Sequence, residues 1–107
     1  MNSEYITTLN DLCEGATIYH LAVETRDHEQ LKKASNIDLE TLDRDGESVL
    51  HYAAVNNDLE TCKLLLELDP SLKDIKCIDG KTPLEWATRY NEEYNTFHQV
   101  CDFLEHN

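Results

Sequence analysis

A short segment that combines a turn with the start of a helix occurs three times in this chain. Its clearest copy spans residues 45–54, with one further copy on either side. The glycines of the three copies, Gly15, Gly46 and Gly80, lie 31 and 34 residues apart. A period of this length is typical of solenoids, in which each repeat buries its apolar face only against its neighbours. The spacing therefore predicts a stack of about three repeats.

Each copy has the residues that a turn and a helix start require. Glycine adopts the positive φ angles of a tight turn without steric cost. Two residues later stand Thr17, Ser48 and Thr82, whose hydroxyls can accept a hydrogen bond from the first helical turn. Pro83 suits the first helical position, and Glu85 has the spacing of a capping box with Thr82. We therefore predict a helix after each turn.

The middle copy predicts two helices separated by a break. Leu50, Ala53 and Ala54 share one face of the first helix. Residues 56–58 form the break, because asparagine tolerates left-handed angles. Pro70 ends the second helix, since the residue before a proline is driven out of helical angles. The apolar face of that second helix consists of Leu59, Cys62, Leu65 and Leu66.

The repeated unit resembles the ankyrin repeat family. The family pattern is approximately D-x-x-G-x-T-P-L-H-x-A-A, followed by a second helix that ends in paired leucines. Residues 43–54 match it with Ser48 and Val49 in place of threonine and proline, and residues 80–87 match it with Glu85 in place of histidine. The first copy keeps the glycine, threonine, histidine and alanine of the pattern. Between the helices of the middle copy, asparagines stand where the family usually has glycine.

The resemblance implies an all-α fold, an ankyrin-repeat solenoid of helix-turn-helix units joined by β-turn or hairpin-like loops. The chain would form a single domain. Its expected parts are an N-terminal capping helix at 3–13, repeat 1 at 14–42, repeat 2 at 43–76, and repeat 3 as the C-terminal cap at 77–107.

The N-terminal helix would place Tyr5, Leu9 and Leu12 on one face, where they would cover the apolar end of the first repeat. A separate binding peptide is the alternative interpretation of this segment.

Several boundaries follow from the spacing of apolar residues. In the first repeat we expect helices at 18–24 and 28–34, and then a short extended stretch at 37–39. In the third repeat we expect a first helix at 83–90. The extra residues of that repeat, 91–95, are expected to lengthen the loop between its two helices.

The chain carries 22 acidic and 9 basic residues, which gives a net charge of −13. Binding to nucleic acid requires concentrated lysine and arginine, so we do not expect it. A basic surface on a partner would be attracted and steered towards such a chain. The alternative is that the acidic residues only keep a small protein in solution.

The four cysteines show no C-x-x-C spacing, which favours free, reduced thiols inside a cell over disulfides. The sequence has no apolar signal region and no segment long enough to span a membrane. We therefore expect a cytoplasmic protein with no membrane association. The composition leaves open whether it acts in its own cell or is delivered into a host.

No motif points to catalysis. The sequence contains no H-E-x-x-H, Walker-type or G-x-S-x-G segment. His20 and His51 occupy the same repeat position. The resemblance implies that this histidine is structural and forms a hydrogen bond near the start of its helix. We predict no enzyme, no cofactor and no metal.

The resemblance implies a binding surface made of the turn tips and the ends of the first helices. The positions that correspond in this chain are Arg44, Asp45, Glu47, Val55 and Asn56 in the second repeat, Ile78, Asp79, Lys81, Arg89 and Tyr90 in the third, and Glu14, Ala16, Glu24 and Thr25 in the first. Ile78 is also expected to anchor its loop onto the helices. Tyr52 and Trp86 share one helical register, and they either line the groove or pack between neighbouring first helices.

Two functions of different kinds are compatible with these features. The first is a non-catalytic module that binds a protein partner, of unknown identity, as a monomer. The alternative is a scaffold or regulatory subunit, or a fragment of a longer array, that acts by assembly or self-association through exposed apolar groups such as Phe103.

Overall fold

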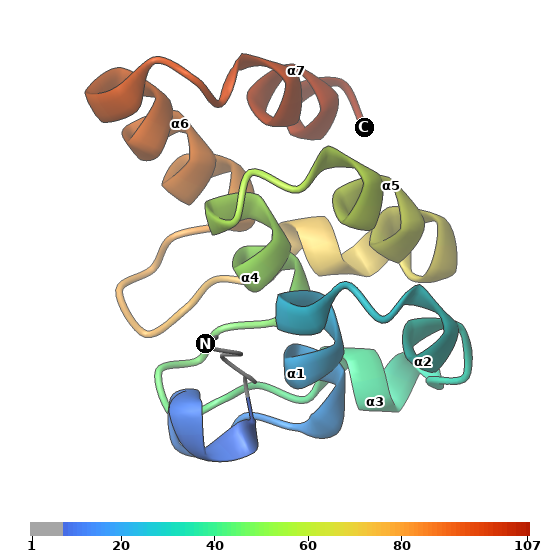
Figure 1. Ribbon diagram of the computed structural model, residues 1–107. Helices are drawn as coiled ribbons and strands as arrows, with labels where there is room; N and C mark the ends of the chain where they lie inside the picture. Colours follow the sequence, from blue (N-terminus) through green and yellow to red (C-terminus); the bar gives the residue numbers. More distant parts are fainter. Residues whose placement is uncertain (1–7) are drawn as a thin grey trace, which may run out of the picture.

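The computed structural model describes residues 8–107, and this part of the chain is helical with short connections (Figure 1). Its elements in chain order are the 3-10 helix η1 (Leu9–Asp11), α1 (Ile18–Thr25), α2 (His28–Lys32), α3 (Asn36–Glu40), α4 (Val49–Val55), α5 (Leu59–Leu68), the 3-10 helix η2 (Pro70–Asp74), α6 (Pro83–Tyr94) and α7 (His98–His106).

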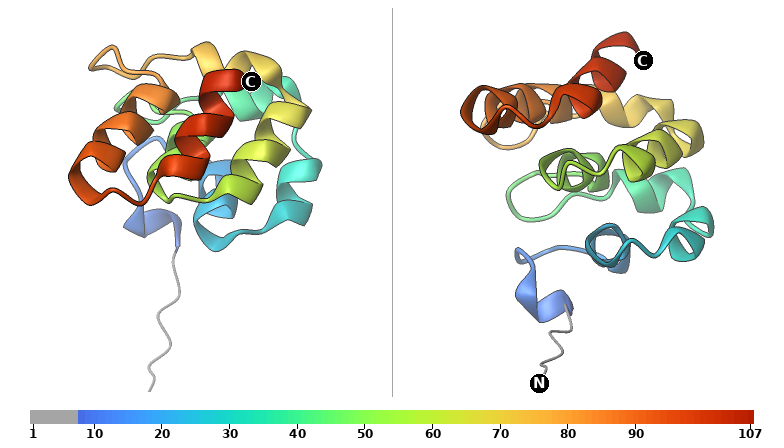
Figure 2. Two further views of the ribbon diagram at one scale, coloured as in Figure 1. Left: turned by 90° about the horizontal axis from the view of Figure 1, so that it is seen from above. Right: turned by 45° about the horizontal axis from the view of Figure 1, so that its top comes forward.

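The helices form two rows. The first row consists of α1, α4 and α6, which pack side by side, and the second row consists of α2, α5 and α7. Figure 2 shows the helical pairs stacked as successive layers, with the connections between layers projecting beside the first row. The described residues form successive layers of paired helices, so the prediction of an all-α solenoid is confirmed.

The turn and cap predictions are confirmed in all three repeats. The φ angles of Gly15, Gly46 and Gly80 are +88°, +76° and +78°. At the start of α6, the Thr82 hydroxyl accepts a hydrogen bond from the Glu85 N–H at 3.2 Å, and the Glu85 carboxylate accepts one from the Thr82 N–H at 2.9 Å. The corresponding threonine and serine cap α1 and α4.

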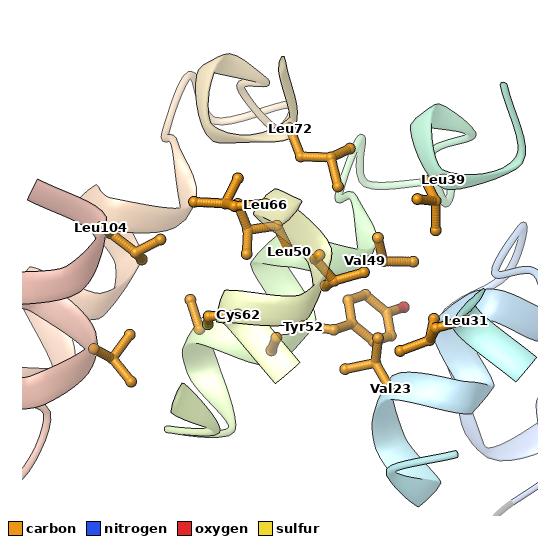
Figure 3. Packing of buried hydrophobic residues seen from close by; sticks show 14 of the residues in the cluster. Val23, Leu31, Leu39, Val49, Leu50, Tyr52, Cys62, Leu66, Leu72 and Leu104 are labelled. Atoms are coloured by element: carbon orange, nitrogen blue, oxygen red, sulfur yellow. The ribbon is translucent and has the colours of Figure 1, made fainter. Parts of the chain in front are cut away.

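The core lies between the two rows and between successive layers (Figure 3). Leu31, Leu50 and Leu65 are completely buried in it. Ala53 and Ala54 are also completely buried, and their small side chains let α4 lie close to its neighbours. The packing therefore couples each repeat to the next, as expected for a solenoid.

Consecutive turns touch through their backbones. The turns are turn 1 (residues 13–16), turn 2 (residues 43–47) and turn 3 (residues 77–81). The N–H of Arg44 in turn 2 donates to the carbonyl of Glu14 at 2.7 Å, and the N–H of Ile78 in turn 3 donates to the carbonyl of Asp45 at 2.8 Å. These bonds fix the separation of the turn tips.

Residues 36–40 form the helix α3, so the prediction of an extended stretch at 37–39 is wrong. The Ser35 hydroxyl accepts a hydrogen bond from the Asp38 N–H at 3.1 Å, and the Asp38 carboxylate accepts one from the Ser35 N–H at 2.9 Å. This capping box starts a new helix. The preceding helix α2 ends at Lys32, two residues before the predicted boundary.

The extra residues of the third repeat lengthen α6 instead of forming a loop. The helix continues to Tyr94, and Asn95 ends it with a left-handed φ of +57°. Trp86, Tyr90 and Tyr94 follow at i, i+4 and i+8, and their stacked rings support the extra turn. The predicted end of this helix at residue 90 is therefore wrong.

Two smaller expectations also differ from the structure. Within the described residues the N-terminal helix is only the turn η1, and Leu12 follows it in an extended conformation while packing against the core. Tyr5 and the rest of that predicted helix before Thr8 lie outside the described residues. Ile78 is 73% exposed, so it does not anchor its loop.

Substitution of the turn glycines by alanine tests the contact between turns. A Cβ at Gly46 would lie 2.9 Å from the backbone nitrogen of Ile78, whereas a Cβ at Gly80 would meet nothing within 4 Å. Both positions have positive φ, which costs an alanine about 1–2 kcal/mol. We expect Gly46→Ala to lower the free energy of unfolding by at least about 1 kcal/mol more than Gly80→Ala, measured by urea denaturation. Equal losses would contradict the close approach of turns 2 and 3.

Candidate functional site

A buried carboxylate organises turn 2. One oxygen of Asp43 accepts hydrogen bonds from the N–H groups of Asp45 at 3.0 Å and Glu47 at 2.8 Å. Its other oxygen accepts from the Tyr52 hydroxyl at 2.7 Å. Burial and the adjacent Asp43 carboxylate raise the pKa of Tyr52, so the hydroxyl remains a donor. The buried Asp43 carboxylate thus fixes the backbone of turn 2, while Arg44 and Asp45 remain exposed at its tip.

Tyr52 is a structural residue. It is only 7% exposed, and its ring packs against His20 of the preceding repeat with the ring centroids 4.7 Å apart. In the third repeat, Cys77 and Trp86 take the places of Asp43 and Tyr52, and the indole N–H donates to the Cys77 sulfur at 3.4 Å. Trp86 is only half-buried. Of the two aromatic residues at this register, the structure therefore places only Trp86 at the surface.

The repeat histidines connect each first-row helix to the next turn. His20 Nδ1 accepts a hydrogen bond from the N–H of its own N-cap residue at 3.0 Å, and His51 does the same at 3.1 Å. Because Nδ1 accepts, the proton lies on Nε2. His20 Nε2 donates to the carbonyl of Glu47 at 2.9 Å, and His51 Nε2 donates to the carbonyl of Lys81 at 2.8 Å. The structural role expected for both histidines is confirmed. Each histidine also forms a second hydrogen bond, to the backbone of the next repeat, that the sequence does not predict.

Most predicted contact residues lie at the surface, in two groups. One group lies at the turns and the other at the ends of the first-row helices. The exposed members are Glu14, Thr25, Arg44, Asp45, Asn56, Ile78, Asp79 and Arg89, the half-buried members are Ala16, Glu24, Glu47, Val55, Lys81, Trp86 and Tyr90, and Tyr52 is buried.

The tips of turns 2 and 3 form one acidic patch. Partial burial raises the pKa of Glu47, and the nearby carboxylates of Asp43, Asp45 and Asp79 raise it further. The carboxylates of both turns therefore lie close enough to Glu47 to act on its charge. Arg44 adds little positive charge to this patch because it pairs with Glu14 of turn 1.

A hollow of about 640 Å³ opens at the other end of the first-row helices. Across it, the Asn56 amide donates to the Glu24 carboxylate at 2.8 Å, and Arg26 pairs with the buried Asp58 at 3.2 Å. Asn57 has a left-handed φ angle of +56°, which confirms the predicted break at 56–58. Arg26, which ends α1, also has a left-handed φ angle, of +59°. The sequence prediction did not include Arg26 in this region, because no local pattern distinguishes it from other surface arginines.

The exposed face of α6 carries a row of aromatic rings. The ring centroids of Trp86 and Tyr90 are 6.1 Å apart, and those of Tyr90 and Tyr94 are 6.0 Å apart. Phe97 stacks on Tyr90 at 5.6 Å, and the Arg89 guanidinium lies over the Trp86 ring at 5.7 Å. Tyr94 is not among the predicted contact residues because the sequence predicts a loop at 91–95, although the i+4 spacing of Tyr94 from Tyr90 is a helical signal.

Residues 8–107 contain no group of three or more histidine, cysteine, aspartate or glutamate side chains that could hold a metal ion. The four cysteines are free. Burial raises the pKa of the Cys62 thiol to about 12, so this thiol is a poor nucleophile. None of the described helices is long and apolar enough to cross a membrane.

A comparison with protein families matches residues 19–105 to a model of three ankyrin repeats. The chain belongs to the ankyrin repeat family. Ankyrin repeats are generally non-catalytic modules of protein–protein interaction. A comparison with curated proteins gives no match to the chain.

The buried histidines predict a stability that depends on pH. Burial lowers the pKa of both His20 and His51 below the ordinary value of about 6.5. The unfolded chain therefore binds more protons, and the histidine contribution, complete above about pH 6.5, is lost as the pH falls towards the lower pKa of the folded state.

We expect His51→Leu to lower the free energy of unfolding by about 1–3 kcal/mol near pH 7.5, because the Lys81 carbonyl loses its donor. The difference in the free energy of unfolding between the variant and the wild type should become smaller near pH 5.5, because the wild type has lost part of its histidine contribution there. The raised pKa of Glu47 makes stability increase as the pH falls, which is opposite to the effect of the histidines, but this contribution is the same in the variant and the wild type. Urea denaturation at both pH values measures the two free energies of unfolding. A difference between variant and wild type that is the same at both pH values would refute the prediction.

Proposed function

We propose that this ankyrin-repeat chain is a non-catalytic binding module that recognises a protein partner. The proposed surface consists of the three turns, the exposed face of α6 and the ends of α1 and α4. Tyr52 is excluded because it is buried. The remaining contact residues predicted from the sequence stay in the proposal.

The observation that supports this proposal most directly is the half-exposed aromatic row beside rigidly held turns. Aromatic side chains and arginine are the usual anchors of protein interfaces. Trp86, Arg89 and Tyr90 lie together on one helix, and Trp86 is bonded to Cys77 at the base of turn 3. Because the turns are fixed to their neighbours by backbone hydrogen bonds, a partner would bind with little ordering cost.

We propose a protein partner and not a nucleic acid, since a chain with a net charge of −13 repels phosphates. We also propose that the protein acts in a reducing compartment inside a cell, because its four cysteines are free.

A comparative capture experiment tests this function. Wild-type protein and an Ile78→Ala/Tyr90→Ala variant would serve as bait in an extract of the source organism. The matched control is Ile37→Ala/Phe103→Ala, which truncates one exposed isoleucine and one half-buried aromatic residue away from the proposed surface. We expect a partner whose affinity falls about tenfold or more in the first variant and stays unchanged in the control.

Equal capture by all three proteins would move the binding site away from this surface. Capture of no protein by the wild type would contradict the proposed function.

One observation supports the alternative function of assembly. The face of α1 that points away from α4 has a hollow of about 250 Å³ lined by Ile18, Leu21 and Ala22, and Ile18 is 48% exposed. Another repeat could stack on such a face.

Light scattering at several concentrations tests assembly through this face. The alternative predicts a dimer or larger particle that Ile18→Asp converts to a monomer. A monomer at every concentration for the wild type would argue against self-association through α1.

A further inference from the structure

The aromatic row of α6 extends beyond its neighbour in the stack. In the second repeat, α4 ends at Val55, whereas α6 continues to Tyr94 before Asn95 ends it. Trp86, Tyr90 and Tyr94 span two helical turns, or about 12 Å. Tyr94 is 58% exposed, and Trp86 and Tyr90 are half-buried. The row is therefore a strip of stacked rings that is most exposed at Tyr94 and partly exposed at Trp86 and Tyr90.

This strip already holds a cation of the chain itself. The Arg89 guanidinium lies 5.7 Å from the centroid of the Trp86 ring, within the range of cation–π attraction. Arg89 is exposed, so the contact can be exchanged for a cation from outside. The Trp86 ring is thus placed so that a guanidinium can lie over it.

The surroundings of the strip are acidic. Glu92 and Glu93 are exposed on α6, and none of the ion pairs between described residues involves either of them. The Glu93 carboxylate lies close enough to raise the pKa of the Tyr94 hydroxyl. At the other end, Trp86 is bonded to turn 3, which carries Asp79 of the acidic patch together with Lys81. The strip therefore has carboxylates at both ends, accompanied by a lysine only at the turn 3 end.

We infer that the aromatic row of α6 is the docking site for an extended basic segment of a partner protein, with lysine or arginine side chains on the rings and between the flanking carboxylates. This inference rests on the proposed function and adds the chemistry of the partner. About four residues of extended chain cover 12 Å. The site thus accepts a short segment with two or more cationic side chains.

Charge selects this occupant over the others. A second copy of the chain would carry the same net charge of −13 and would be repelled. A nucleic acid would be repelled for the same reason. A basic segment gains from the attraction of the whole chain as well as from the local contacts.

Arg89, which the proposed function includes among the contact residues, acts towards a basic segment as a competitor for the Trp86 ring and not as an anchor. It shields one face of Trp86 in the free protein and competes with the incoming cation for the same ring. Removal of its charge should therefore strengthen the binding of a basic segment, although the residue lies in the middle of the site. A surface that merely required Arg89 as a contact would respond in the opposite direction.

A titration with synthetic peptides tests the inference. The probe is the blocked peptide Ac-Gly-Arg-Lys-Gly-Arg-Lys-Gly-NH2, and the comparison peptides replace every arginine and lysine with glutamine or with glutamate. Trp86 is the sole tryptophan of the chain, so its intrinsic fluorescence reports binding at the proposed place. Calorimetry on the same samples gives the affinities independently of this residue.

We expect saturable binding of the basic peptide at concentrations up to about 1 mM, with an affinity at least about tenfold higher than that for the glutamine peptide. Tyr90→Leu and Glu93→Gln should each weaken it about threefold, whereas Arg89→Gln should strengthen it about threefold. The charge-matched control Glu67→Gln, on the exposed side of α5, should leave the affinity unchanged.

Several results would overturn the inference. The first is no binding of the basic peptide, or equal or tighter binding of the glutamine or glutamate peptide. The second is a loss of affinity for the basic peptide that is as large in Glu67→Gln as in Glu93→Gln. The third is weaker binding of the basic peptide by Arg89→Gln. The capture experiment is judged separately, since a partner that depends on Tyr90 but binds through a non-basic segment would preserve the proposed function and refute only the inference.

Discussion

The hydrogen bond from each repeat histidine to the backbone of the next repeat connects the core of this protein to its surface. His20 and His51 are buried, and each ring joins the start of its own helix to the carbonyl of a residue in the following turn. The turns also contact one another directly, through one backbone hydrogen bond between each consecutive pair and through the ion pair of Arg44 with Glu14. The histidines also fix turn 2 relative to α1 and turn 3 relative to α4.

Local chemistry explains how much of the fold could be predicted from the sequence. The positive φ of Gly46 and the cap at Thr82 depend on residues a few positions apart, and both were predicted. The sequence does not predict α3, because the alternation of Ile37 and Leu39 favours an extended stretch although Ser35 and Asp38 have capping-box spacing. The contact of Gly46 with turn 3 depends on the stacking of repeats, which no local pattern shows.

The candidate site shows the same limit. Tyr52 and Trp86 have the same place in their repeats, so the sequence treats them alike. Their burial differs because the Tyr52 hydroxyl is bonded to the buried Asp43, whereas Trp86 reaches the sulfur of Cys77 and remains half-exposed. The turn residues were easier to predict, since a tight turn leaves the side chains at its tip in solvent.

Neutral histidines with the proton on Nε2 thus hold successive repeats together. Long-range proton–nitrogen NMR of the imidazole rings at about pH 6.5 tests it directly, with the exposed His106 as the reference for a ring in solvent. The structure predicts that His20 and His51 are both neutral, with an unprotonated Nδ1 and a slowly exchanging Nε2 proton. A proton on Nδ1 of either ring, or a charged ring at this pH, would contradict the account.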